Sequence, residues 1–413
     1  MTQQILTEKE NELVTRWSKS LNESGSGYDA VKGHAQRLVT AQLMENQAGN
    51  LNESTPNGVA GVDNWNPILI SMVRRIAPRL IAYDVMGVQP MTGPTGLIFA
   101  LKARYANDPA KRPNDQSLPE AMGIDEVNAG YSGDGVANSG DTFGPTPMVR
   151  GGGIETSVGE VQAWNAMGVT VERTEVVAKT RQLRADYSQE LAEDMKRIHN
   201  LSAEGELINI LTNEITSELN REVLGKIYAS AKIGASWTAQ AGTFDLNTDS
   251  DGRWSVEKYK GLITAIEFDA NRIALETRRG KGNKLFVSAD VGTILQQAGL
   301  LDFTPALQAN TSINVDPSGA TYSGRLNGRY DVYIDPYATG DGYCVGYKGV
   351  DQYDAGIFYC PYVPLQLSRA VNTDMFTNAI GFKTRYGIVA NPFTKLDNNS
   401  NAYYRKAVVK SLL

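Results

Sequence analysis

One apolar stripe constrains the fold of this chain more than any other feature of its sequence. Its members are spaced four residues apart, and Ile208 and Ile210 widen it: Leu207, Leu211, Ile215, Leu219, Val223 and Ile227. This spacing places the side chains on one face of an α-helix, so the sequence predicts a helix over roughly 203–231. At 1.5 Å per residue such a helix is about 40 Å long, which is long for a globular domain. We therefore expect it to act as a spine for its surroundings.

Two predicted strands enclose a long irregular segment upstream of this helix. Residues 97–105 alternate apolar with other side chains, and residues 169–184 form a returning strand. Residues 106–160 between them are irregular and rich in Gly and Pro at their centre. A loop of this length is uncommon inside a compact domain unless it is functional or extended. The pattern predicts an extended excursion flanked by two strands.

The rest of the chain mixes helices with short strands. Helical periodicity over 5–47 and a polar linker over 46–67 indicate a small helical unit at the N-terminus, separable from the rest. Residues 255–299 alternate helix, strand, helix, and residues 285–289 are the buried strand. Later strands are predicted at 329–335, 342–349, 356–367 and 407–413. The predicted class is α+β, a mixed sheet with helices packed on it.

Composition excludes several classes of protein. The 413 residues exceed what one compact core usually organises, so two or more structural units are expected. A net charge of −6 argues against a main affinity for the phosphate backbone of nucleic acid. The two cysteines, Cys344 and Cys360, match no zinc spacing and are expected to be free thiols. The sequence shows neither a secretory signal nor an apolar run near the ~20 residues of a membrane helix, so we expect a soluble protein made in the cytoplasm.

Catalytic and metal-binding patterns are weak throughout. Residues 247–258 begin like a calcium loop, but Lys258 stands where a bidentate carboxylate is needed. Two glycines in the basic turn 278–282 lack the strand and helix of a phosphate-binding loop. Only His34 and His199 are available for histidine catalysis, and the chain has no Gly-x-Ser-x-Gly. We expect no enzyme activity, no cofactor and no metal site.

Several blocks of the sequence resemble the major capsid proteins of T-even-like myoviruses, in order over most of residues 68–413. The blocks are MVRRIAPRLIAYDVMGVQPMTGPTGLIFALKARY (72–105), AKTRQLRADYSQELAEDMKRIHNLSAEGELINILTNEITSELNREV (178–223), GRYDVYIDPYA (328–338), VGYKG (345–349), DAGIFYCPYVPL (354–365) and GFKTRYGIVANPF (381–393). The resemblance implies the capsid fold shared by tailed bacteriophages and herpesviruses. Its parts fall at a helical propeptide (1–53), an N-terminal arm (54–96), an extended loop with flanking strands (97–184), a peripheral domain with the spine helix (185–250), an axial domain (251–340) and return strands of both domains (341–413).

The resemblance also implies a function and its partners. The expected protein is the head protein that self-assembles into the icosahedral shell around phage DNA, as hexamers and, unless a paralogue fills the vertices, pentamers. Scaffold and prohead protease would act during assembly in the host bacterial cytoplasm, and portal, vertex or decoration proteins in the virion. DNA would be enclosed without sequence-specific binding, and no membrane insertion is expected. The alternatives are a vertex capsid protein of the same family and an encapsulin shell.

The segment between the predicted strands at 97–105 and 169–184 is several tens of residues shorter than in T-even relatives. We therefore expect the insertion domain of those relatives to be missing. A decoration protein could then supply the contact that it makes.

Proteolytic trimming is a further implication, because family members are cut after a (Leu/Ile)-x-Glu tripeptide. Here Leu-x-Glu ends at Glu8, Glu23, Glu45 and Glu53. The last of these precedes the expected arm, so Glu53–Ser54 is the predicted cut and Glu45–Asn46 the alternative.

Charged residues in the arm are candidates for contacts between subunits. Arg74, Arg75 and Arg79 are interleaved with apolar residues and followed by Asp84. Such charges fix the register of an interface more than they raise its affinity. The alternative is that each arginine faces solvent, where a lone ion pair is worth little.

Overall fold

A computed structural model gives the fold of most of the chain. It describes residues 11–22, 34–53, 80–106, 130–136, 149, 151–161, 164–198, 200–250, 252, 254–298, 301–303, 321–350, 354–372, 377–392 and 398–412. Arg74, Arg75, Arg79 and Ser54 lie outside these residues, as does His199.

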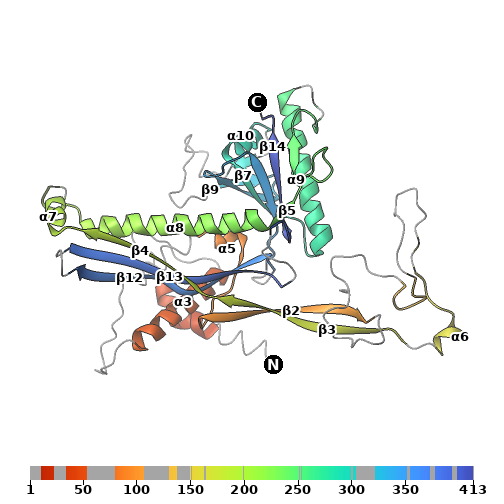
Figure 1. Ribbon diagram of the computed structural model, residues 1–413, viewed down its shortest axis with the longest axis horizontal. Helices are drawn as coiled ribbons and strands as arrows, with labels where there is room; N and C mark the ends of the chain where they lie inside the picture. Colours follow the sequence, from red (N-terminus) through yellow and green to blue (C-terminus); the bar gives the residue numbers. More distant parts are fainter. Residues whose placement is uncertain are drawn as a thin grey trace.

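The predicted spine is helix α8, Ala203–Ser230, which runs along the long axis of the molecule (Figure 1). Ser202 caps its N-terminus, since the Ser202 Oγ accepts a hydrogen bond from the Gly205 N–H at 3.3 Å. Glu204 and Glu206 lie in the first turn, where acidic side chains interact favourably with the helix dipole. Most of the predicted stripe is buried: Leu211, Ile215, Leu219, Val223 and Ile227. The expected helix is therefore confirmed to within about a residue at its ends.

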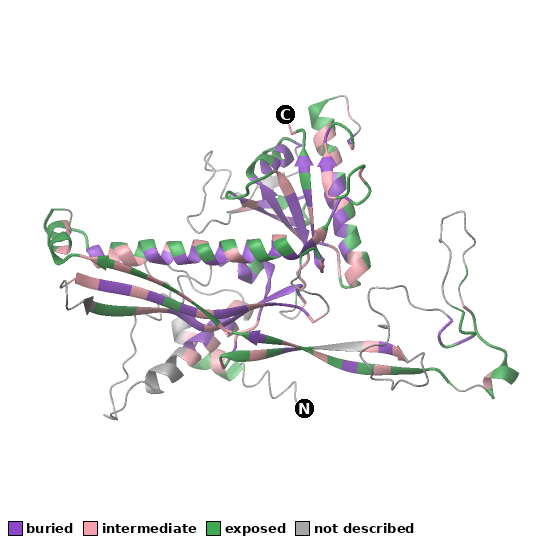
Figure 2. Cartoon of the chain, viewed as in Figure 1, coloured by how far each residue is buried: buried purple, intermediate pink, exposed green. Residues whose placement is uncertain are grey.

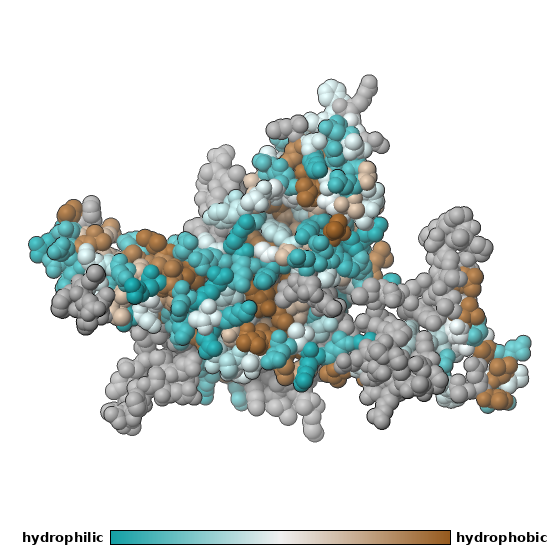
Figure 3. Space-filling model, viewed as in Figure 1, coloured by the Kyte–Doolittle hydropathy of each residue, from teal (hydrophilic) through white to brown (hydrophobic). Residues whose placement is uncertain are grey.

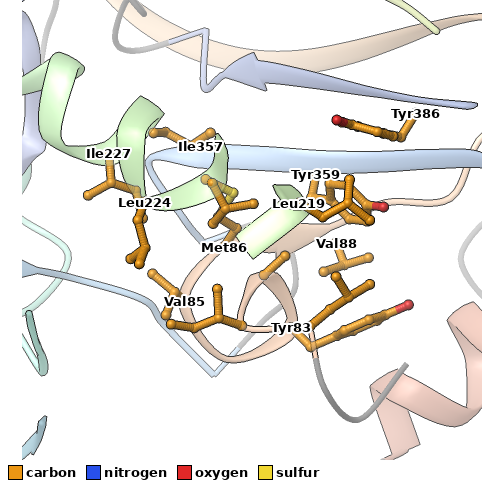
Figure 4. Packing of buried hydrophobic residues seen from close by; sticks show 14 of the residues in the cluster. Tyr83, Val85, Met86, Val88, Leu219, Leu224, Ile227, Ile357, Tyr359 and Tyr386 are labelled. Carbon is orange, nitrogen blue, oxygen red and sulfur yellow. The ribbon is translucent and has the colours of Figure 1, made fainter. Parts of the chain in front are cut away.

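A four-stranded sheet packs against one side of α8. Its order is β1 (Gly87–Val88), β12 (Ile357–Asn372), β13 (Thr377–Ala390) and β4 (Lys179–Tyr187). Strand β1 forms the edge of this sheet beside β12, and the short helix α5 (Ala82–Val85) just before it packs into the same core as α8 (Figure 4). The labelled side chains in this view belong to one apolar core: Tyr83, Val85, Met86, Val88, Leu219, Leu224, Ile227, Ile357, Tyr359 and Tyr386. The main core thus joins segments from residue 39 to residue 404.

An arginine from the sheet completes the charged edge of α8. The sequence places Glu218 and Glu222 one turn apart, with Lys226 one turn beyond Glu222. In the structure Arg181 of β4 forms ion pairs with both, with 3.0 Å between its Nη1 and the Glu218 Oε2. The two negative charges on the helix are therefore balanced by Arg181, which lies on a strand and 37 residues before Glu218 in the sequence.

Strands β2 (Thr95–Ala106) and β3 (Ala166–Val177) form an antiparallel hairpin that projects from the body (Figure 1). Gly387 allows the base of the hairpin to approach β13, because a Cβ at this glycine would lie 2.4 Å from Val176 Cγ1.

The predicted single strand over 169–184 is wrong. It is two strands, β3 and β4, which separate at Ala178 and belong to different sheets. Ala178 donates its N–H to the Pro94 carbonyl at 2.9 Å, and the chain turns there from the hairpin into the body.

The second body contains a larger mixed sheet on the other side of α8. In the described ranges its strands are β5 (Ala231–Ile233), β14 (Asn401–Lys410), β11 (Gly342–Gly346), β7 (Lys284–Ser288), β10 (Tyr330–Asp335), β9 (Thr321–Leu326) and β8 (Leu301–Phe303), with β6 (Thr243–Asp245) paired to β14. Helices α9 (Ser255–Thr277) and α10 (Ala289–Gln297) cover it with a separate apolar core. The α+β class is confirmed. Because β5 and β6 join this sheet, it begins upstream of the predicted boundary at residue 251.

The N-terminal helices are α2 (Ser18–Asn22) and α3 (His34–Glu53). The expected separable unit is wrong, because Val39 and Leu43 of α3 are buried in the main core. The expected linker over 46–67 is wrong at its start, since α3 continues to Glu53. Tertiary packing of α3 against β12 stabilises a helix through polar residues that by themselves favour a loop.

Candidate assembly surfaces

The hairpin presents an apolar row on one face. The register pairs Leu97 with Glu175, Phe99 with Arg173 and Ala103 with Val169, and directly opposed residues point to the same side of a sheet. The exposed apolar side chains of this face are Leu97, Phe99, Met167, Val169 and Val171, with Phe99 62% and Val169 61% exposed. Figure 2 shows the predominance of exposed residues along the hairpin. In the described part of the chain no element covers this row.

The opposite face of the hairpin is apolar and buried at its base, where Ile98 and Val176 pack with residues of β12 and β13, and polar further out. Arg104 is buried, its Nε donates to the Thr170 Oγ1 at 3.1 Å, and its guanidinium pairs with Glu172. This cross-strand network stabilises the outer part of the ribbon, beyond the apolar cluster at its base. The hairpin is therefore a projection with an exposed apolar row on one face and a polar network on the outer part of the other.

A second apolar patch lies at the hairpin's far end, around helix α6 (Thr156–Gly159). Ile154 and Val158 are exposed there, Val161 is 88% exposed, and Trp164 is 91% exposed. Apolar colour gathers at this tip in the space-filling view (Figure 3). An exposed tryptophan beside aliphatic side chains is typical of an interaction site, where aromatic residues provide much of the binding energy.

The opposite end of the molecule carries α7 (Gln189–Ile198), an amphipathic helix with no buried residue. Leu191 is 50% and Ile198 73% exposed, and Leu201 is exposed just beyond the helix. Helices α7 and α6 lie at the two ends of the long axis (Figure 1). Each end of the molecule therefore exposes apolar side chains.

Asp84 is the one predicted interface residue that the structure describes. It is an exposed residue of α5, and its carboxylate interacts with the charges of Lys284 and Lys348 in the same chain. Its cationic neighbours are thus intramolecular, and a role between subunits stays a prediction. The same holds for Arg74, Arg75 and Arg79.

The two candidate cleavage sites lie in different parts of α3. Glu45 accepts hydrogen bonds from Arg16 Nη1 at 2.6 Å and Trp17 Nε1 at 2.9 Å. The Asn46 Nδ2 donates to the carbonyls of Met91 at 2.8 Å and Tyr362 at 3.2 Å. Both residues of the Glu45–Asn46 bond are therefore held within the middle of the helix. Glu53, in contrast, is its last residue.

Other residues singled out in the sequence have structural roles. Cys344 and Cys360 are free and buried, as expected, and burial raises the pKa of the Cys360 thiol to about 12. Lys258 Nζ donates to Asn247 Oδ1 at 2.7 Å and so closes the turn that begins like a calcium loop.

Among the described residues no group of three or more His, Cys, Asp or Glu is arranged to hold a metal ion. None of the helices in these ranges has the length and apolar character needed to cross a bilayer.

Comparison with known proteins gives consistent matches. The family model of the major capsid protein Gp23 matches residues 62–409. The major capsid protein of Salmonella phage ViI is 38% identical over 452 positions, with all of both chains covered. That of Enterobacteria phage T4 is 33% identical over 520 positions, covering 97% of this chain and 99% of the relative.

The alignment with the T4 protein is longer than the 413 residues of this chain, so that relative carries stretches that are missing here. Among solved structures, the capsid of Myoviridae phage XM1 superposes with a TM-score of 0.43 at 11% identity, covering 80% of this chain and 92% of that one. A chain from Microbacterium phage Oxtober96 gives 0.42 at 13%, covering 88% and 98%.

Proposed function

The chain belongs to the Gp23 family of major capsid proteins, and we propose that it builds the shell of a tailed-phage head by binding other copies of itself. The observation that carries the self-association is the uncovered apolar row on the β2–β3 hairpin. A projecting ribbon cannot bury this row against its own body. Contact with a neighbouring subunit removes the row from water, at about 25 cal/mol per Å² of apolar surface.

The placement of the exposed patches supports head-to-tail association. The hairpin tip and α7 lie at opposite ends of the long axis, so a contact between the tip of one copy and the α7 end of the next joins different surfaces (Figure 1). Contacts of this kind close into rings when the rotation between copies fits. Six-fold capsomers, and five-fold ones at vertices unless a paralogue fills them, are the rings proposed here.

The N-terminal segment is proposed to be trimmed by a viral protease after Glu53. A protease binds its substrate in extended form, so a bond within a folded helix must first unfold. The Glu45–Asn46 bond is held by side chains on both sides, whereas Glu53 ends α3. Helix ends fray with little free-energy cost. These contacts favour Glu53–Ser54 over the alternative.

The remaining partners follow from a shell role. Scaffold and protease act during assembly, and portal, vertex and decoration proteins complete the particle. The shell encloses DNA without reading its sequence, and a net charge of −6 suits a wall from which DNA must move freely. The protein is accordingly placed in the capsid of the virion, without insertion into a membrane.

Substitution on the hairpin tests the proposal. Val171→Asp places a charge in the apolar row at a side chain that is 56% exposed. Such a change leaves the stability of the subunit within about 0.5 kcal/mol of wild type. We expect electron microscopy of the expressed protein to show shells for the wild type and unassembled subunits for Val171→Asp.

Val350→Asp is the matched control, because Val350 is fully exposed on the body and not on the hairpin. It should assemble like the wild type. Normal shells from Val171→Asp would contradict the proposed interface. The position of the labelled protein in particles distinguishes a subunit of the whole shell from a protein that is confined to the vertices.

A further inference from the structure

The four-stranded sheet has one covered face and one open face. Helix α8 lies along the covered face, where Phe382 and Tyr386 of β13 belong to the main core (Figure 1). Because successive side chains of a strand point to opposite sides, Lys383 and Arg385 of β13 belong to the other face. The apolar cluster at the hairpin base packs on that face at one end. Farther along β13 and β4 this face is open to solvent in the described part of the chain, since Lys383 and alternate residues of β4 are exposed.

The open face is polar and carries more positive than negative charge. The register of the three strands places these charged and polar side chains together on it: Thr180, Gln182, Arg184, Asp186, Gln366, Ser368, Lys383 and Arg385. Three of them are cations and one is an anion, so the face has an excess of two positive charges on a chain whose net charge is −6. In the described parts of β4, β12 and β13 no large apolar side chain is exposed. The face therefore offers a protein partner little apolar surface to bury.

Two of the cations have no counter-ion among the residues that the structure describes. Arg184, 71% exposed, forms an ion pair with Asp186 of its own strand at 2.7 Å. Lys383, in contrast, is exposed and has a glutamine opposite it on each neighbouring strand. The guanidinium of Arg385 lies over the ring of Tyr362 at 5.3 Å, and its Nε has no hydrogen-bond partner. Stacking on an aromatic ring holds the plane of a guanidinium and leaves its N–H groups for an acceptor such as a phosphate oxygen.

We propose that the open face of the four-stranded sheet is turned to the inside of the shell, where Lys383 and Arg385 bind the phosphate backbone of the enclosed DNA. The proposal rests on the shell role under Proposed function, because a shell around a genome has DNA phosphates along its inner side. Exposed hydroxyl and amide groups, such as those of Thr180 and Gln182, add neutral donors of the kind that contact phosphates. With about two phosphate contacts per subunit, each contact is weak and sensitive to salt. Many subunits together still position the outer layer of DNA, and the DNA remains free to move.

The test is a titration of a fluorescently labelled DNA duplex of about 20 base pairs with the full-length chain, followed by anisotropy. The affinity of the wild type should fall about tenfold between 50 and 200 mM salt, as expected for two phosphate contacts. The double variant Lys383→Gln/Arg385→Gln should bind at least fivefold more weakly at 50 mM salt and lose most of this salt dependence. The matched control is Lys226→Gln/Lys260→Gln, which removes the same charge from exposed positions of α8 and α9. Its affinity should stay within about twofold of the wild type, because a charge away from the contact contributes little through salt solution.

Equal losses of affinity in the two double variants would overturn the proposal, because charge anywhere on the surface would then attract DNA. A wild-type affinity that does not depend on salt would overturn it as well. Should the double variant fail to fold by circular dichroism, Lys383→Gln alone must weaken binding and remove about half of the salt dependence.

Formaldehyde cross-linking of DNA-filled heads, with mass spectrometry of the peptides, tests the orientation separately from the shell role. Adducts between DNA and Lys383 support the proposal. DNA-filled heads of this protein with adducts on Lys226 or Lys260 and none on Lys383 refute it and leave the shell role standing. A chain that binds DNA through Lys383 and Arg385 and is absent from heads refutes the shell role, and with it the orientation, but not the DNA-binding face.

Discussion

At the scale of single residues, a charged side chain adds a contact where the main core joins the two bodies. Lys348 follows β11 and donates its Nζ proton to the Tyr83 carbonyl of α5, so it links the two bodies. Its position is costly because burial disfavours the ammonium and lowers the pKa of Lys348 to about 8. Lys284 opposes and Asp84 favours the charged form. The link therefore depends on pH.

Stability should rise with pH because of Lys348. Between its folded pKa of about 8 and its ordinary value of 10.5, the unfolded chain binds a proton that the folded chain has released. The penalty for burying the ammonium is present in full below pH 8 and is relieved as the pH rises through it. We expect the free energy of unfolding to increase by about 1–2 kcal/mol between pH 7.5 and 9.5, allowing for partial exposure. Thermal or urea unfolding across this range measures it.

Lys348→Met should flatten this rise, because the group that titrates is gone. Lys383→Met, at an exposed position of β13, should keep the wild-type profile. If the free energy of unfolding of Lys348→Met still rises with pH as in the wild type, another titrating group causes the rise.

At the scale of elements, α3 holds the two candidate cleavage sites in different surroundings. Its middle is held by contacts on both sides, through Glu45 to Arg16 and through Asn46 to Met91. Glu53, in contrast, is the last residue of the helix. The difference lies in tertiary contacts, since both tripeptides have the same Leu-x-Glu pattern.

Glu53→Gln should prevent removal of the N-terminal segment, because a protease that selects glutamate loses its recognition group. Intact-mass measurement of the protein from particles should give a chain beginning at Ser54 for the wild type and an uncut chain for Glu53→Gln. Glu45→Gln is the matched control. It loses only an ion pair worth at most about 1 kcal/mol, with Arg16 68% exposed, and should still be cut after Glu53. A wild-type chain that begins at Asn46 would show that the cut lies after Glu45 and not after Glu53.

At the scale of the whole molecule, two packed bodies share one helix, and apolar surface accumulates where the chain extends furthest from them. The outer part of the hairpin extends away from both bodies (Figure 1), and apolar side chains gather at its tip (Figure 3). Side chains exposed there add little to the stability of the isolated subunit. The proposed function assigns this surface to contacts with neighbours, and so stability and assembly should be separable by mutation.

Val161→Asp at the tip should show this separation. The side chain is 88% exposed, so the thermal midpoint of the subunit should stay within about 2 °C of wild type. Assembly should nevertheless be reduced at least tenfold in yield, measured by density-gradient centrifugation of the expressed protein. Val350→Asp again controls for an added surface charge. Equal yields of assembled particles from Val161→Asp and Val350→Asp would show that the tip takes no part in assembly.

Local periodicity was sufficient to predict several features. The four-residue stripe from Leu207 to Ile227 gave the length of α8, because a helix face is defined by neighbours a few residues apart. Alternation predicted a strand over 97–105, observed as β2 over 95–106, and a short apolar run after a glycine turn predicted a strand over 285–289, observed as β7 over 284–288. The buried free thiols also followed from composition and spacing. The exposed hairpin tip was not predicted, although Val161 and Trp164 in a polar, glycine-rich context are a signal for it.

Only the tertiary structure decided which segments share a core. The pattern over 169–184 is continuous, yet its two halves bind different partners and separate at Ala178. Likewise α3 has little amphipathic pattern, and its place in the main core depends on residues up to 322 positions away, from Leu43 to Leu365. Residues 231–245 joined the larger sheet because β14, at the far end of the chain, pairs with them. Helix periodicity is local and can be read along the chain, whereas strand partners and buried faces depend on contacts between distant segments, which the order of residues does not specify.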